Sequence, residues 1–110
     1  HLLLNDVALG EWRTFARLSP PLRGEEDRQA ALAALADGTI DVLCSAHDPR
    51  GPEDKRLPVA DAAPGMAGAE TLLALGLGLV RDGVISLARL FAMLAANPAR
   101  LLGVEAGTLA

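Results

Sequence analysis

Residues 39–50, TIDVLCSAHDPR, decide the fold that the sequence predicts. The first half of this stretch is short, apolar and β-branched, and it follows directly after a predicted helix. Such a run is typical of a buried parallel strand. The stretch then ends in His47, Asp48 and Arg50. Because α/β barrel enzymes carry catalytic side chains at the C-terminal ends of their strands, this ending predicts a site at a strand tip.

The segments on both sides of this stretch are predicted to be helical. Upstream, residues 24–37 begin with three acidic side chains, which the helix dipole favours in a first turn. Downstream, residues 68–83 form one helix, and a second follows with Ser86 as its N-cap. Asn97-Pro98 is predicted to end that helix and to start a one-turn successor. Helix, strand, loop and helices in this order indicate an α/β fold and the last βα unit of a barrel.

The composition excludes several classes of function. The net charge is −4 and the basic residues are scattered, so no surface for nucleic acid is expected. No apolar stretch is long enough to span a bilayer, and no signal peptide is visible. The single cysteine, Cys44, cannot form an internal disulfide and is predicted to be packed in the core. We therefore expect a soluble, cytoplasmic protein that binds no membrane.

The two ends of the chain indicate a segment of a larger protein. The sequence has no initiator methionine, begins inside the apolar run HLLL and ends on GTLA. Its 110 residues contain enough apolar side chains for about one small core. We expect residues 1–110 to form one partial domain. The charged run PEDKR, residues 52–56, is predicted to solvate a long ordered loop.

Six blocks of the sequence carry a resemblance to a known family. They are HLLLND, LSPPLRGEEDRQA, DGTIDVLCSAHDP, PEDK, PGMAGAETLL and NPARLLG. In this order they resemble the C-terminal part of the dihydroorotases, of the multifunctional-complex type, in the amidohydrolase superfamily. The resemblance covers nearly the whole chain. It implies the C-terminal portion of a TIM-like (β/α)8 barrel, a helix-rich segment with one buried parallel strand.

The resemblance also implies an activity and a cofactor. Such proteins are zinc-dependent hydrolases of cyclic amides that interconvert dihydroorotate and N-carbamoyl-aspartate in pyrimidine biosynthesis. One or two zinc ions would be bound mostly by residues outside this segment. The bound metal lowers the pKa of a water molecule and polarises the carbonyl that is attacked. A small-molecule substrate and a homo-oligomer are expected.

Four candidate site residues are carried over position by position from the resemblance, and a fifth, Asp48, is added from its own chemistry. His1 matches a histidine of a pair that includes a zinc ligand, and we expect it to be a metal ligand. Gly65 matches a glycine whose backbone approaches the substrate. His47 and Arg50 are the expected substrate contacts, with Arg50 on the substrate carboxylate. Asp48 is the candidate catalytic residue.

One departure leaves the activity open. The position of the family's catalytic aspartate is occupied by Ala46, which can neither bind zinc nor move a proton. Asp48 could take over the role, since alternate side chains leave an extended strand on the same side. The site could instead work with weaker metal binding while Arg50 holds the substrate.

Two further interpretations of the chain stay open. It could be a catalytically inactive relative that serves as a structural partner of aspartate transcarbamoylase. A hydantoinase- or allantoinase-type cyclic amidase is a lesser alternative. Without its flanking blocks, HDPR would equally be typical of a solvated turn.

Overall fold

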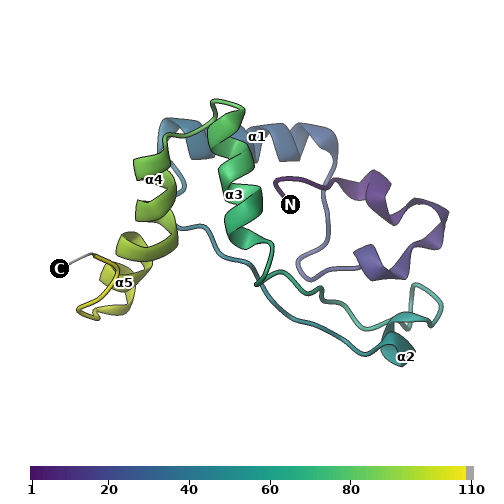
Figure 1. The fold of residues 1–110 in the computed structure, drawn as a ribbon. Helices are drawn as coiled ribbons and strands as arrows, with labels where there is room; N and C mark the ends of the chain where they lie inside the picture. Colours follow the sequence, from purple (N-terminus) through teal and green to yellow (C-terminus); the bar gives the residue numbers. More distant parts are fainter. Residues whose placement is uncertain (109–110) are drawn as a thin grey trace. The chain divides into compact units, whose positions relative to one another are not determined.

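The computed structural model describes residues 1–108, and every regular element within them is a helix (Figure 1). None of these helices is long and apolar enough to cross a membrane. The chain divides into two compact units. The first comprises His1–Ala31 and Ser45–Thr71, and the second comprises Leu32–Cys44 and the chain from Leu72 onward. The elements are η1 (Asp6–Trp12), η2 (Thr14–Ala16), α1 (Glu25–Asp37), α2 (Pro52–Lys55), α3 (Leu72–Arg81), α4 (Leu87–Phe91), η3 (Ala92–Ala96) and α5 (Asn97–Leu102).

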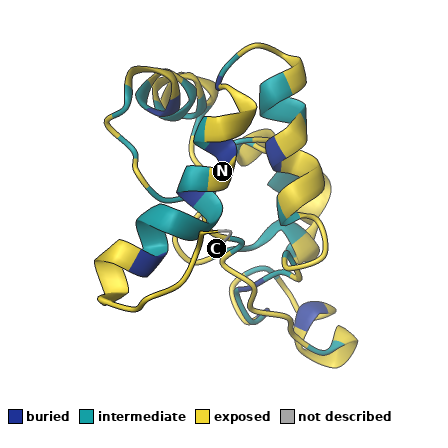
Figure 2. Cartoon of the chain, turned by 60° about the vertical axis from the view of Figure 1, so that its left-hand side comes forward, coloured by how far each residue is buried: buried dark blue, intermediate teal, exposed yellow. Residues whose placement is uncertain are grey.

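The second unit has a small apolar core. Leu35, Leu90 and Met93 are completely buried, and Ile85 is nearly so. Figure 2 shows how few positions of the chain reach this degree of burial. Leu90 lies directly over Gly76 of α3, where an added Cβ would come within 2.6 Å of the Leu90 Cδ1 atom. The missing side chain at Gly76 therefore allows α3 to pack closely against α4.

The predicted strand over residues 39–46 is not formed within the described part of the chain. Residues 40–50 have no regular hydrogen-bonded structure. A parallel strand exists only through a ladder of hydrogen bonds to its neighbour. Residues 1–108 contain no second strand that could supply this ladder. The α/β class is thus visible here only as its helical part.

Helical residues satisfy the polar backbone of the predicted strand instead. The Arg89 guanidinium donates from Nε to the Leu35 carbonyl at 3.2 Å and from Nη2 to the Ile40 carbonyl at 3.1 Å. The Asn97 amide donates to the Asp41 carbonyl at 2.7 Å. Buried or half-buried backbone groups need such partners, because an unpaired one costs free energy. Cys44 at the end of this segment is exposed, so the prediction that it packs in the core was wrong.

The local helix signals were mostly right. Helix α1 matches the helix predicted over residues 24–37, and the Ser86 hydroxyl accepts from the Arg89 amide at 3.2 Å as the N-cap of α4. The predicted short successor helix was confirmed, since α5 begins at Asn97 with Pro98 in its first turn. The break predicted before it was wrong, since Asn97 has helical torsion angles. The wider π turn of η3 precedes Pro98 in place of an interruption. Proline lacks the amide donor and crowds the preceding turn of an α-helix, and a π turn relieves that crowding.

Candidate functional site

Two loop segments of the first unit, residues 45–50 and 64–69, lie side by side. The Asp48 amide donates to the Met66 carbonyl at 3.0 Å. The Arg50 Nε donates to the Pro64 carbonyl at 3.0 Å. These bonds place four of the five predicted site residues, all except His1, in or beside one pair of segments.

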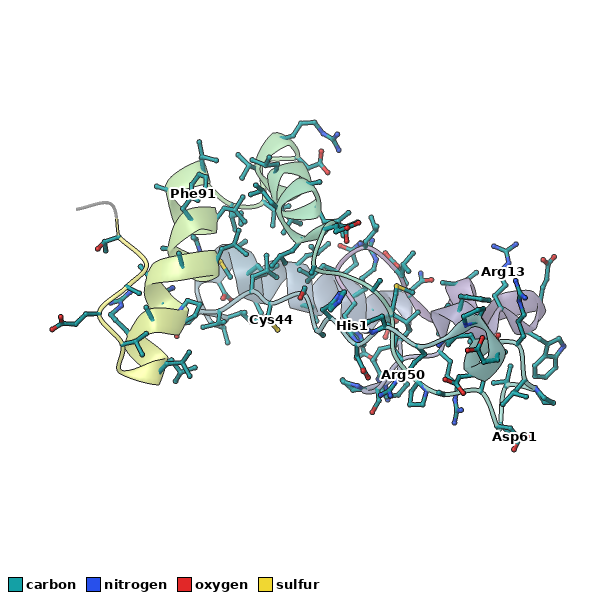
Figure 3. The ribbon with its side chains drawn as sticks, turned by 60° about the horizontal axis from the view of Figure 1, so that its bottom comes forward. His1, Arg13, Cys44, Arg50, Asp61 and Phe91 are labelled. Carbon is teal, nitrogen blue, oxygen red and sulfur yellow. The ribbon has the colours of Figure 1, made fainter. Side chains whose placement is uncertain are left out.

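Asp48 and Arg50 form an ion pair at the edge of this pair of segments. The Arg50 Nη2 atom lies 2.7 Å from the Asp48 Oδ2 atom, and both side chains are partly exposed (41% and 53%). With Nε on the Pro64 carbonyl as well, the guanidinium is fixed at two points. Figure 3 labels the Arg50 side chain. Its Nη1 group has no hydrogen-bond partner among residues 1–108. Arg50 is therefore oriented and still able to donate to a carboxylate.

Gly65 makes the close approach of the two segments possible. It is buried and has φ +132°, a backbone conformation that L-residues rarely adopt. A Cβ here would collide with the Asp48 carbonyl oxygen and would lie 2.9 Å from the Asp48 Oδ2 atom. The Gly65 amide donates to the Arg17 carbonyl at 3.0 Å, and its carbonyl accepts from Lys55. Gly65 therefore serves the site by leaving room for Asp48, because its own amide and carbonyl groups are already hydrogen-bonded within the loop.

His47 is held by a hydrogen-bond pattern that fixes its tautomer. The amides of Gly68 and Ala69 donate to its Nδ1 atom at 3.0 and 3.1 Å. Because Nδ1 accepts, the proton of the neutral imidazole lies on Nε2. A ring in this state presents an N–H donor to its exposed side. It does not offer the bare Nε2 lone pair that a metal ion needs. The role of His47 as a substrate contact stays a prediction.

Lys55 is the organising residue that the sequence interpretation missed. Its side chain is buried (2% exposed). All three ammonium hydrogens have acceptors, the carbonyls of Arg17 (3.1 Å), Ala63 (2.9 Å) and Gly65 (3.0 Å). Burial lowers the pKa of Lys55, the positive charges of Arg17 and Arg50 lower it further, and the Asp48 carboxylate opposes them. The prediction that the PEDKR charges solvate the loop was wrong for this residue.

A weak signal for Lys55 was present in the sequence. It is the only lysine of the chain, and it lies in a loop rich in proline, glycine and alanine. Such a loop has few large apolar side chains to form a core, and its carbonyls need donors. A single long cation can supply three of them. The Thr14 hydroxyl in turn donates to the Lys55 carbonyl.

The described residues do not supply a metal site. No group of three His, Cys, Asp or Glu side chains among residues 1–108 is placed to hold a metal ion. His1 is exposed, although the backbone next to it is anchored where the Arg28 guanidinium donates to the Leu2 carbonyl at 2.9 Å. Ala46 has no ligand atom, and the Asp48 carboxylate is bonded to Arg50. The role of His1 as a metal ligand stays a prediction.

Comparison with known proteins gives a consistent result. No protein-family model matches the chain. It is 45% identical over 107 residues to the dihydroorotase of Desulfotalea psychrophila, covering 97% of this chain and 25% of that protein. It is 42% identical over 112 residues to the dihydroorotase of Anaeromyxobacter dehalogenans, covering 100% of this chain and 26% of that protein. The chain therefore spans about a quarter of the length of the curated relatives it matches.

Solved structures match over the same extent. The L-hydantoinase (dihydropyrimidinase) from Arthrobacter aurescens superposes with a TM-score of 0.92 and 31% identity, covering 99% of this chain and 26% of that one. The dihydropyrimidinase from Brevibacillus agri superposes with a TM-score of 0.89 and 26% identity over the same shares. These structures and the sequence relatives agree that the chain corresponds to about a quarter of each matched protein.

Proposed function

Because this chain is homologous to a segment of the dihydroorotases, about a quarter of their length, we propose that it works as part of a dihydroorotase-type hydrolase. The reaction is the interconversion of dihydroorotate and N-carbamoyl-aspartate, in pyrimidine biosynthesis. The segment contributes the C-terminal part of a TIM-like barrel, as one partial domain. Residues 39–46 then become a strand once a neighbouring strand pairs with them.

The observation that carries this proposal is the fixed, half-exposed guanidinium of Arg50. Dihydroorotate has a carboxylate, and an oriented guanidinium with free N–H groups binds a carboxylate through short, charge-assisted bonds. Nearby, His47 presents its Nε2–H as a second donor toward a substrate oxygen. Together, Arg50 and His47 form a pair of donors, the polar corner of the site, that holds and orients an anionic ring. Gly65 keeps the two segments close enough for this corner to exist.

The catalytic metal belongs to the rest of the protein in this proposal. His1 is the ligand that this chain contributes, and the remaining ligands come from elsewhere. A bound zinc ion supplies an activated water molecule and polarises the amide carbonyl. Asp48 is the carboxylate nearest to Ala46 in the sequence. Once Arg50 has exchanged Asp48 for the substrate carboxylate, Asp48 would take a proton from the attacking water and pass it to the ring nitrogen that departs.

A second function is favoured by Ala46 itself. Its methyl group replaces the carboxylate that the family uses in catalysis. The residue has φ +48°, a backbone conformation that aspartate and asparagine adopt more often than alanine. A protein that had lost its catalytic carboxylate could persist as a structural partner of aspartate transcarbamoylase. The hydantoinase-type alternative keeps the hydrolysis and changes only the ring that is cut.

Kinetics on the natural full-length protein with zinc test the proposal. Ring opening of dihydroorotate would be followed in wild type, in Asp48→Ala and in Asp61→Ala, whose exposed carboxylate is the matched control. We expect turnover in wild type and in Asp61→Ala, and its loss in Asp48→Ala. Turnover that survives Asp48→Ala would remove Asp48 from the mechanism.

A third variant, Ala46→Asp, separates the two functions. If wild type is inactive and Ala46→Asp gains turnover, the protein is an inactive homologue of a hydrolase. If both are inactive and dihydroorotate does not bind, the hydrolase proposal is wrong. The same assay with a hydantoin as substrate decides the choice of ring.

A further inference from the structure

We propose that Lys55 is a positioning residue for Arg50, and this inference rests on the proposed role of Arg50 in holding a substrate carboxylate. Lys55 does not touch the exposed edge of the site. It acts through the backbone of residues 63–65, which lies between the two cations. The link consists entirely of hydrogen bonds within the first unit.

Three consecutive carbonyl groups connect the two cations. The Lys55 ammonium donates to the carbonyls of Ala63 at 2.9 Å and Gly65 at 3.0 Å. The carbonyl between them, that of Pro64, accepts from the Arg50 Nε atom at 3.0 Å. Lys55 thus donates to the first and third of these carbonyls, and Arg50 donates to the second. Lys55 therefore helps to set the position of the Pro64 oxygen.

Lys55 is itself held firmly enough to act as the reference point. Its third N–H bond reaches the Arg17 carbonyl at 3.1 Å, and the Thr14 hydroxyl donates to its own carbonyl. The Ala63 amide donates to the Asp54 carbonyl at 3.0 Å, which joins residues 63–65 to the short helix α2. A buried ammonium with all its hydrogens bonded has one position.

Loss of the Lys55 ammonium would release Arg50 without touching it. The carbonyls of Ala63 and Gly65 would lose their shared donor, and only the amide bonds of these two residues, to the carbonyls of Asp54 and Arg17, would still hold the backbone between them. The Pro64 oxygen would then cease to orient the Arg50 guanidinium. The hydrogen bond to Asp48 would be the one contact left to orient it. A guanidinium that must be ordered on binding holds a carboxylate less tightly than one that is already oriented.

A double-mutant cycle on the full-length protein tests this. Dihydroorotate binding would be measured by calorimetry in wild type, Lys55→Met, Arg50→Met and the double variant, with Arg56→Met as control. Arg56 is the exposed neighbour of Lys55, and its replacement removes the same charge. We expect Lys55→Met to raise Kd about tenfold and Arg56→Met to change it by less than about twofold. In the Arg50→Met background, Lys55→Met should add nothing, since the residue through which it acts is absent.

The other outcomes separate the two proposals. If Arg50→Met weakens binding and Lys55→Met behaves like Arg56→Met, Lys55 has no positioning role and the proposed function stands. If the two effects simply add, Lys55 acts on binding by another route and the inference is wrong. If Arg50→Met leaves Kd unchanged, the proposed role of Arg50 fails, and the inference fails with it.

A measurement on wild type protects the test against a variant that does not fold. Amine acylation followed by peptide mapping reports whether Lys55 reacts in the native protein. We expect it to stay unmodified until the protein is unfolded, because its ammonium is buried and fully bonded. Rapid modification in the native state would contradict the geometry on which the inference depends. Lys55→Gln, which keeps part of the donor capacity, is the milder variant for the same cycle.

Discussion

Gly65→Ala is the substitution for which the structure gives the clearest expected magnitude. Two costs combine at this position. A non-glycine residue at φ +132° is strained by about 1–3 kcal/mol. The new Cβ would also collide with the Asp48 carbonyl and lie 2.9 Å from its carboxylate, so residues 45–50 and 64–69 must separate. We expect the free energy of unfolding to fall by about 3 kcal/mol in total.

A matched glycine isolates the collision from the strain. Gly83 also has a positive φ, +74°, and nothing lies within 4 Å of an added Cβ in this chain. Gly83→Ala should therefore lower the free energy of unfolding only by the strain of placing alanine in the left-handed conformation, about 1 kcal/mol. Urea unfolding of the full-length variants, with dihydroorotate binding measured alongside, compares the two. Gly65→Ala should lose both stability and binding, whereas Gly83→Ala should keep its binding. Equal losses of stability in the two variants would refute the reasoning from the close approach to Asp48.

Two further predictions concern the scaffold. Leu90→Ala should lower the free energy of unfolding by about 2–5 kcal/mol, because Leu90 is completely buried. Leu87→Ala, on the same helix but 49% exposed, should cost much less, and thermal unfolding that ranks the two equally would contradict the assigned core. Hydrogen bonds from Arg28, then Gln29 and Asn5, lower the pKa of Glu25 from 4.5 to about 2, so its contribution to stability is complete above pH 4.5 and is lost as the pH falls towards 2. The stability difference between wild type and Glu25→Gln should therefore close over that range. A Glu25→Gln difference that does not vary with pH would contradict this prediction.

Local signals in the sequence were reliable guides to the helices. The acidic first turn of α1 and the Ser86 N-cap act through neighbours three or four residues away, and both predictions were confirmed. The prediction of a break at Asn97-Pro98 failed because a π turn in the preceding helix accommodates the proline. That alternative depends on how the helix packs, which a local pattern does not contain.

The family of the chain also followed from the sequence, because the six blocks and their order along the chain can be recognised without knowing any tertiary contact. The comparisons confirm that relation for a segment of the dihydroorotases. The strand over residues 39–46 could not be confirmed in the same way. Its side-chain pattern is local, whereas its hydrogen bonds must come from a neighbour. In the described residues the Arg89 guanidinium and the Asn97 amide satisfy part of that backbone.

The sequence by itself determined the longer helices, the family and the titratable residues gathered at HDPR, since these depend on residue identity and short spacing. Only the tertiary structure decided what those residues do to one another. It gave His47 its tautomer through two amides about twenty residues away, and it paired Asp48 with Arg50. It also turned Lys55 from an expected surface charge into the buried donor of three carbonyls. The physical reason is that a polar group takes whichever partner folding brings within hydrogen-bond distance, and a buried one must find such a partner.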